Sequence, residues 1–348
     1  MNNLFDLDIS PSPFISLRNN FFLAFYSDED PRYEYQILIP NSCSFLPIEP
    51  DSPTFKSGFL PIANFETNEK LNSEMINIMI VLRHLKREIR IFDCIKLDMY
   101  GVEAKILKKL DASEKFGYEA EALVQLIQNG QKWLCRSRMI KDGIRLFRID
   151  FKVPEEIYPK FIDTCSIVLK SFKLLHPEEG GSVEQLNKHL CMIPEELSFR
   201  YPSSWVIQQN YNSSNEYTNI SLSGKFDGYI KGKILLIIQR YKNYSLLDCI
   251  REFLMEIIEE LKNKFIYPIV NSPIFPFRPI ANSRKTSIIL LRAFACNKNY
   301  IIFPIIVAEY DNKLILLSLI PQSKDISNEE WAIQNRAFEI VRDTLKVE

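Results

Sequence analysis

The sequence predicts an α+β fold in which one unit occurs twice, each copy an antiparallel β-sheet packed by helices. Two observations lead to this prediction. Segments of the first half recur in the same order in the second half, and tight-turn signals separate consecutive strand patterns. Strands joined by consecutive hairpins pair antiparallel. A chain of 348 residues has the length of two domains. We therefore expect strand, strand, helix, three-stranded meander and helix in each unit, with the two units packed as a pseudo-dimer.

Three pairs of segments carry the repeat. The first is an apolar alternation that runs into Pro, a polar residue and Ser. The second is an apolar run that leads through basic and polar residues to Asp-Cys-Ile and a basic residue, and it aligns without a gap. The third is a turn before an apolar strand. In order, the pairs are 37–43 with 199–205, 79–96 with 234–251, and 142–149 with 311–317. Agreement of three pairs in the same order favours duplication.

The first unit is expected to span 1–176. After a Pro-rich lead, alternation predicts a strand at 34–39. A polar, Pro-rich stretch at 47–73 comes next, and its length suggests a covering arm or a binding loop. An apolar run predicts a strand at 76–85. Apolar residues at helical spacing then predict a helix at 88–100, which a glycine ends.

A meander and a closing helix complete the first unit. Asn129-Gly130 and Asp142-Gly143 tolerate the positive φ that type I′ hairpins require at both central residues. The helix is expected at 155–171, with its regular part confined to the residues after Pro159. The strands of the meander are expected at 119–127, 132–140 and 144–151.

A linker at 177–188 separates the units, because it combines Pro, paired Gly and charge without apolar periodicity. The second unit is expected to span 189–348. Its first helix carries an apolar stripe from 250 to 261, and Ser327 and Glu330 have capping-box spacing at the start of the last helix. The expected strands are 198–201, 218–222, 233–239, 286–295, 300–309 and 313–320.

Composition and charge exclude several classes of protein. The net charge of −1, from 43 basic and 44 acidic residues, argues against a nucleic-acid partner. The acidic start has neither a basic n-region nor an apolar h-region, so we expect no signal peptide. The longest apolar run is too short to span a bilayer, which predicts no stable membrane insertion. Seven cysteines without a CxxC pair predict reduced thiols and a cytoplasmic location.

The sequence offers no catalytic, cofactor or metal motif. The three histidines have no evident ligand partners, so no metal site is predicted. Cys94 and Cys249 each follow an Asp, and a neighbouring negative charge raises a thiol pKa, against activation. Neither a phosphate loop nor a nucleophile elbow is present. We therefore expect a protein that is not an enzyme and binds no cofactor.

One asymmetry between the halves suggests a binding surface. The middle strand of the first meander carries Arg136 and Arg138 on one face, which predicts a solvated face. Its counterpart at 300–307 and the next strand at 314–320 are apolar on both faces, and such strands must be covered on both sides. Helices and the other unit, or a hydrophobic partner helix, would provide that cover. The candidate client-binding residues are Ile301, Phe303, Ile305, Val307 and Leu316.

Two short motifs resemble the PsbP/Mog-like fold superfamily. They are Tyr-Pro-Ser-Ser-Trp at 201–205 and Val-Leu-Lys-Ser-Phe at 168–172, with weaker copies at 39–43 and 341–345. The first half departs from the family by having Cys43 where Trp is frequent. The resemblance implies a binding protein, and among cytosolic branches the chain is most similar to the Eag-type, DcrB-related effector chaperones of bacterial type VI secretion.

The resulting hypothesis is a non-catalytic cytoplasmic adaptor or chaperone that shields an apolar segment of a protein client. The resemblance implies a client with hydrophobic helices, such as a secreted effector. The alternative is a structural or regulatory module that binds a folded partner, such as a secretion component or a GTPase.

Overall fold

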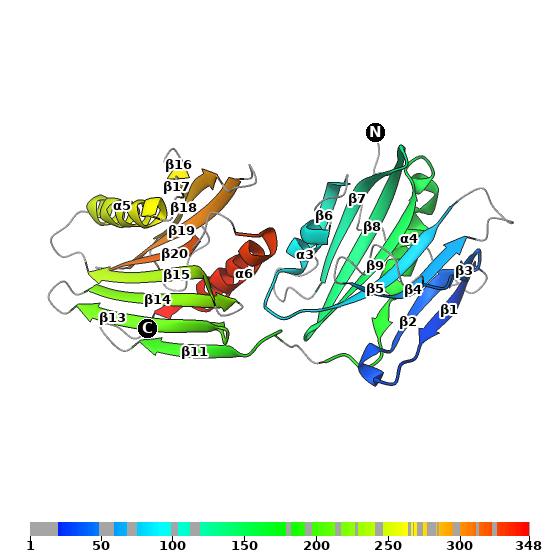
Figure 1. The fold of residues 1–348 in the computed structure, drawn as a ribbon, viewed down its shortest axis with the longest axis horizontal. Helices are drawn as coiled ribbons and strands as arrows, with labels where there is room; N and C mark the ends of the chain where they lie inside the picture. Colours follow the sequence, from blue (N-terminus) through cyan, green and yellow to red (C-terminus); the bar gives the residue numbers. More distant parts are fainter. Residues whose placement is uncertain are drawn as a thin grey trace. The chain divides into compact units, whose positions relative to one another are not determined.

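The computed structural model divides the chain into two compact units (Figure 1). Unit 1 comprises Met1–Lys86 and Arg90–Val183, and unit 2 comprises Arg87–Ile89 and Glu184–Glu348. The boundary therefore falls within the expected linker, and the first strand of unit 2 already begins at Leu186. The structure describes residues 20–48, 59–67, 75–98, 104–111, 119–178, 182–191, 197–212, 217–226, 229–240, 246–263, 266, 268–269, 274–276, 283, 285–294, 300–310, 313–321 and 326–347.

Unit 1 contains a seven-stranded antiparallel sheet, in the order β3-β4-β5-β9-β8-β7-β6, and a small sheet β1-β2-β10. Helix α3 follows β5, and helix α4 follows β9. The elements are β1 (Phe21–Tyr26), the 3-10 helix η2 (Pro31–Tyr33), β2 (Tyr35–Pro40), β3 (Cys43–Phe45), β4 (Leu60–Thr67), β5 (Asn77–His84), α3 (Ile91–Asp98), β6 (Ala104–Asp111), β7 (Glu119–Gln128), β8 (Gln131–Asp142), β9 (Arg145–Pro154), α4 (Tyr158–Ser171) and β10 (Lys173–Leu174).

Unit 2 repeats this order of elements. Its large sheet runs β13-β14-β15-β20-β19-β18-β16, with β17 also pairing β18, and its small sheet is β11-β12-β21. The elements are β11 (Leu186–Cys191), β12 (Leu197–Pro202), β13 (Trp205–Asn212), β14 (Tyr217–Phe226), β15 (Tyr229–Arg240), α5 (Leu246–Asn263), β16 (Pro268–Ile269), β17 (Ile274–Pro276), β18 (Lys285–Phe294), β19 (Tyr300–Tyr310), β20 (Lys313–Pro321), α6 (Asn328–Thr344) and β21 (Lys346–Val347). The predicted α+β class with antiparallel sheets is confirmed.

The strand registers correct the gapless alignment of the two halves. Ile80 pairs with Ile149 in unit 1, and Leu236 pairs with Leu317 in unit 2. These four side chains lie in the core clusters that also contain residues of α4 and α6, respectively. The alignment placed Leu235 opposite Ile80, but Leu235 belongs to the cluster with α5 residues. The alignment is therefore one residue out of register in this strand, and a shift of one moves each side chain to the other face.

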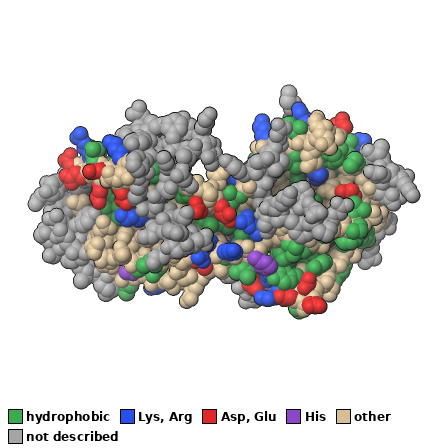
Figure 2. All heavy atoms as spheres, in the orientation of Figure 1, with side chains coloured by type: hydrophobic (Ala, Val, Ile, Leu, Met, Phe, Trp, Pro, Cys, Tyr) green, Lys and Arg blue, Asp and Glu red, His purple; other side chains and the backbone are tan. Residues whose placement is uncertain are grey.

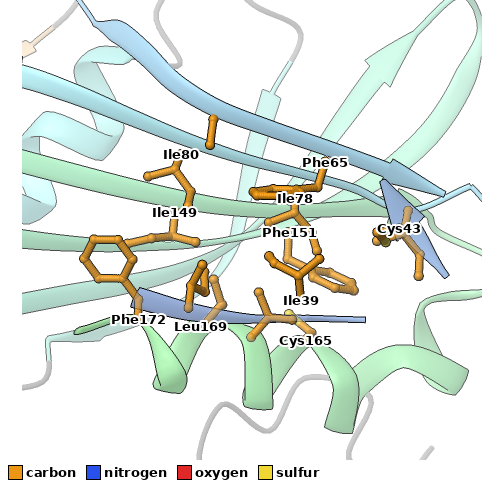
Figure 3. Packing of buried hydrophobic residues seen from close by; sticks show 14 of the residues in the cluster. Ile39, Cys43, Phe65, Ile78, Ile80, Ile149, Phe151, Cys165, Leu169 and Phe172 are labelled. Carbon is orange, nitrogen blue, oxygen red and sulfur yellow. The ribbon is translucent and has the colours of Figure 1, made fainter. Parts of the chain in front are cut away.

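The main core of unit 1 lies between its large sheet on one side and β2 with α4 on the other. Figure 3 shows Ile80, Ile149 and Phe151 on the sheet, pointing toward Ile39 on β2 and Leu169 on α4. All five side chains are fully buried. This packing uses alternate residues of each strand, as the pleat requires.

The two hairpin signals give two different turns. Asn129 and Gly130 both have positive φ, 51° and 76°, between the paired residues of β7 and β8, so the predicted type I′ turn is confirmed. In the second hairpin Asp142 pairs with Arg145, so the central residues are Gly143 and Ile144 rather than Asp142 and Gly143. Gly143 has φ 59°, and glycine at the first central position is typical of type II′.

The Pro-rich stretch at 47–73 is not a loop throughout. Its residues 60–67 form β4, which pairs with β5 through a register shift between Pro61 and Ala63. A break in the ladder accommodates Pro61, because proline has no backbone N–H to donate. The capping box at the start of α6 is confirmed, with Ser327 and Glu330 each bonding the other's backbone N–H.

The prediction that Arg136 and Arg138 mark a solvated face is wrong. Arg136 is fully buried; its Nε contacts the Glu121 carboxylate, and its Nη1 donates to Ser166 Oγ on α4 at 2.7 Å. Arg138 Nη1 donates to the Leu169 carbonyl of the same helix at 2.6 Å. Partners on β7 and α4 replace water around both guanidinium groups, so a helix covers this face.

The buried ion pair gives a stability prediction. Arg136→Met leaves the Glu121 carboxylate buried without its cation, and breaking such a pair costs about 3–5 kcal/mol of unfolding free energy. We expect the double variant Arg136→Met with Glu121→Leu to recover most of that loss. Hydrogen exchange of the β7 and β8 amides in the full-length protein measures both changes. Equal stability of the single and double variants would contradict a coupled pair.

Candidate partner-binding surface

The structure places the predicted client-binding residues in the core of unit 2. Phe303, Ile305, Val307 and Leu316 are at most 5% exposed. They lie in one cluster with residues of α5, which runs alongside β18 to β20 (Figure 1). Ile301 belongs to β19, but its side chain lies outside the described residues. The expected open apolar surface is therefore covered at these four positions.

The cover comes from the apolar stripe of α5. Phe253, Ile257 and Leu261 are buried against β19 and β20, as their helical spacing predicts. Strands that are apolar on both faces thus lie between two helices, since α6 residues pack on the opposite face. Pro304 lies where the ladder between β19 and β20 stops, while pairing with β18 continues. Proline has no backbone N–H to donate to a ladder.

Burial disfavours the thiolate form of three described cysteines. Cys94 and Cys165 are fully buried. Burial raises the pKa of Cys43 to about 11 and that of Cys135 to about 12, and it also raises the pKa of Cys165. The side chain of Cys249 lies outside the described residues. A thiol held protonated at neutral pH is a poor nucleophile.

Each histidine has a neighbouring polar group. His84 Nε2 lies 2.9 Å from the Tyr33 hydroxyl, and His176 Nε2 lies 3.3 Å from a Glu34 carboxylate oxygen. His189 lies 3.1 Å from the Gln209 side chain, and burial lowers its pKa. Within the described part of the chain, no group of three or more His, Cys, Asp or Glu residues could hold a metal ion.

An apolar surface that the sequence analysis missed lies on β1. Leu23 is 55% exposed and Phe25 is 62% exposed, while Ala24 and Tyr26, between and beside them, pack on the core. Phe22 is also exposed. Figure 2 shows hydrophobic side chains at the surface of this part of unit 1. The signal was available, because six uncharged, mostly aromatic residues occur consecutively at 21–26, within the stretch interpreted as a Pro-rich lead.

On the same residues, the outer edge of the β1 backbone pairs with no strand in the described part of the chain. Among the described strands β1 pairs only with β2. The Asn41 N–H donates to the Asn20 carbonyl, and Leu38, which pairs with Leu23, donates its N–H to Ser171 Oγ instead of to β1. Antiparallel ladders alternate in this way. The N–H and C=O groups of Leu23 and Phe25 therefore point away from β2.

Acidic residues follow the end of β1. Asp28 accepts hydrogen bonds from the Tyr26 hydroxyl at 2.9 Å and from the Asp30 N–H at 3.0 Å. The Glu29 side chain is exposed. Asp30 pairs with Arg32, and this hydrogen bonding lowers the pKa of Asp30 to about 2. The apolar strand is thus followed directly by an acidic turn.

The equivalent edge strand of unit 2 is different. β11 occupies the same place in its small sheet as β1, but it carries an exposed Lys188 and a half-buried His189. Its exposed apolar side chain is Leu190, at 47%. Charged residues, lysine above all, are a common protection of sheet edges against pairing with other chains. β1 lacks this protection.

The sequence matches no protein-family model and no curated protein. Similar solved structures include cyanobacterial PsbP from Synechocystis, with 15% identity, covering 44% of this chain and 92% of that one, TM-score 0.33. A mutant of protein Mog1 shares 12% identity and covers 40% of this chain and 90% of that one, TM-score 0.29. The type VI secretion immunity protein TplEi from Pseudomonas aeruginosa shares 9% identity over 90% and 94% of the two chains, TM-score 0.23. At these TM-scores the similarities say nothing about function.

No described helix is long and apolar enough to cross a membrane.

The burial of β19 gives a prediction about the expected client surface. Ile305 is fully buried, so Ile305→Asp places a carboxylate without a partner in the core of unit 2. We expect it to unfold unit 2 or to destabilise it by more than about 3 kcal/mol. Hydrogen exchange of the β15 and β20 amides measures this loss. A folded variant with unchanged exchange would show that α5 leaves this position accessible.

Proposed function

We propose that this chain is a non-catalytic, cytoplasmic protein-binding module that holds an apolar segment of a client on β1. The observation that supports the proposal most directly is the exposure of Leu23 and Phe25 on a strand whose outer edge pairs with no described strand. Burial of a large apolar side chain contributes about 1.5–3 kcal/mol. Two such side chains, beside an edge that no described strand pairs, give a partner apolar area to bury and backbone groups to bond at β1.

The proposed site on β1 replaces the site on β19 and β20 that the sequence predicts. The expected ligand, an apolar segment of a protein client, stays the same. Phe303 and Ile305 already bury their apolar surface beneath α5, so a client would have to displace a helix of 18 residues to reach them. At β1 a client would displace no described element, because β1 is the edge strand of the small sheet. An adaptor or chaperone that shields a client segment fits this open edge.

We also infer that the two units arose by duplication and that only the first keeps the binding edge. The corresponding order of strands and helices supports duplication. The charged residue Lys188 on β11 supports a division of roles, since it protects the equivalent edge. A chaperone of the Eag type, with a secreted effector as client, is the finer form of this hypothesis.

Photo-crosslinking in cells of the source organism tests the proposal. A photoreactive phenylalanine analogue at position 25 should capture a defined protein partner. In affinity purification without the analogue, Leu23→Lys combined with Phe25→Lys should lower recovery of that partner at least about tenfold, because the charges oppose burial of the strand.

The matched control is Leu190→Lys, which places the same charge on an exposed apolar position of the equivalent strand in unit 2. It should leave recovery unchanged. Equal loss in both variants would point to a general surface effect, and undiminished recovery in the double variant would place the partner elsewhere. A partner captured only through its folded surface would favour the regulatory module over the chaperone.

A further inference from the structure

The open edge of β1 restricts the form in which a partner segment binds. Resting on the proposed function, we propose that β1 receives an extended segment of the partner as an added β-strand. The partner chemistry is alternating apolar side chains, flanked by a basic residue that lies against the acidic turn at 28–30.

Backbone direction supports strand addition over simple side-chain docking. Leu38 directs its N–H to Ser171 Oγ at 2.9 Å, away from its pair Leu23. On the other side of β2, Leu175 donates to the Glu34 carbonyl at 3.0 Å, which agrees with the same alternation. The N–H and C=O groups of Phe21, Leu23 and Phe25 are therefore the set that faces outward. An added strand satisfies these groups, as in other edge-strand complexes.

The side chains of the same residues define what the added strand must carry. Leu23 and Phe25 project from one face of the small sheet, and a residue of the added strand on that face would lie beside each of them. Alternate positions of the partner must therefore be apolar. The positions between them need only be neutral, because nothing on β1 itself is charged.

Charge complementarity determines which residues are favoured at the ends of the added strand. Asp28, Glu29 and Asp30 follow β1 directly, and Arg32 pairs with Asp30. Asp28 and Glu29 leave an excess of negative charge beside the open edge. A lysine or arginine at the matching end of the added strand is favoured, and a carboxylate there is opposed.

The test uses a synthetic peptide of alternating valine and threonine with a lysine at each end. One control peptide carries N-methyl groups on alternate amides, which removes the donors of one edge. A second carries glutamate in place of both lysines. Fluorescence anisotropy measures the affinity of each peptide for the full-length protein, and hydrogen exchange followed by NMR reports individual amides.

We expect the lysine peptide to slow exchange of the Phe21, Leu23 and Phe25 amides at least about tenfold. A tenfold slowing means that each amide is free of its hydrogen bond for about one tenth of the time. The N-methyl and glutamate peptides should each bind at least about tenfold more weakly. Leu190→Lys should again have no effect, and Leu23→Lys should abolish the slowed exchange.

Other outcomes overturn the inference in distinguishable ways. Equal binding of the N-methyl peptide would mean side-chain docking without strand addition, and the proposed function would stand. Slow exchange of the three amides without peptide would show that the edge is already occupied. If that protection rises with protein concentration, the occupant is a second copy, and if it does not, the occupant is another part of this chain. Absence of both peptide binding and a crosslinked partner would remove the proposed function as well.

Discussion

Both large sheets depend on having cover over each of their two faces. In unit 2, β20 directs Ile315, Leu317 and Leu319 toward the cluster with α6, and it directs Leu314 and Leu316 toward the cluster with α5. A strand of this kind is stable only when both sides are excluded from water. The apolar surface that looks most available in the sequence is therefore consumed within the unit. The proposed partner surface lies instead on the edge strand β1.

In unit 1, part of the sheet face that lies opposite α4 is polar. Ser137 pairs with Asp150 across β8 and β9 and donates to its carboxylate at 2.5 Å. At the corresponding point of unit 2, Ile305 pairs with Ser318. This pair of unit 2 therefore has one more apolar side chain to cover than its counterpart in unit 1. The polar face of unit 1 is thus opposite to the one that carries Arg136.

The sequence was sufficient where a local rule decides the structure. Asn129-Gly130 specifies its turn through φ, and Ser327 specifies the start of α6 through its own hydroxyl. The sequence was insufficient where an element far away in the chain determines whether a side chain is buried. Arg136 looks solvated until α4 supplies Ser166, 30 residues away in the chain. For strands apolar on both faces, alternation cannot assign a face, which explains the one-residue shift in the alignment and the misplaced client surface.

The contrast between the two edge strands is the strongest argument for a role of β1. An apolar edge invites pairing with any exposed strand, so natural sheets protect such edges with charge. β11 follows this rule with Lys188, whereas β1 has six uncharged residues and keeps its charges outside the strand, at Asp28 and Glu29. Flanking charges of this kind limit indiscriminate association while they leave the backbone accessible. In the proposed complex these charges would also favour a segment with basic flanks over one with acidic flanks. An edge that served only the fold of unit 1 would gain nothing from this arrangement.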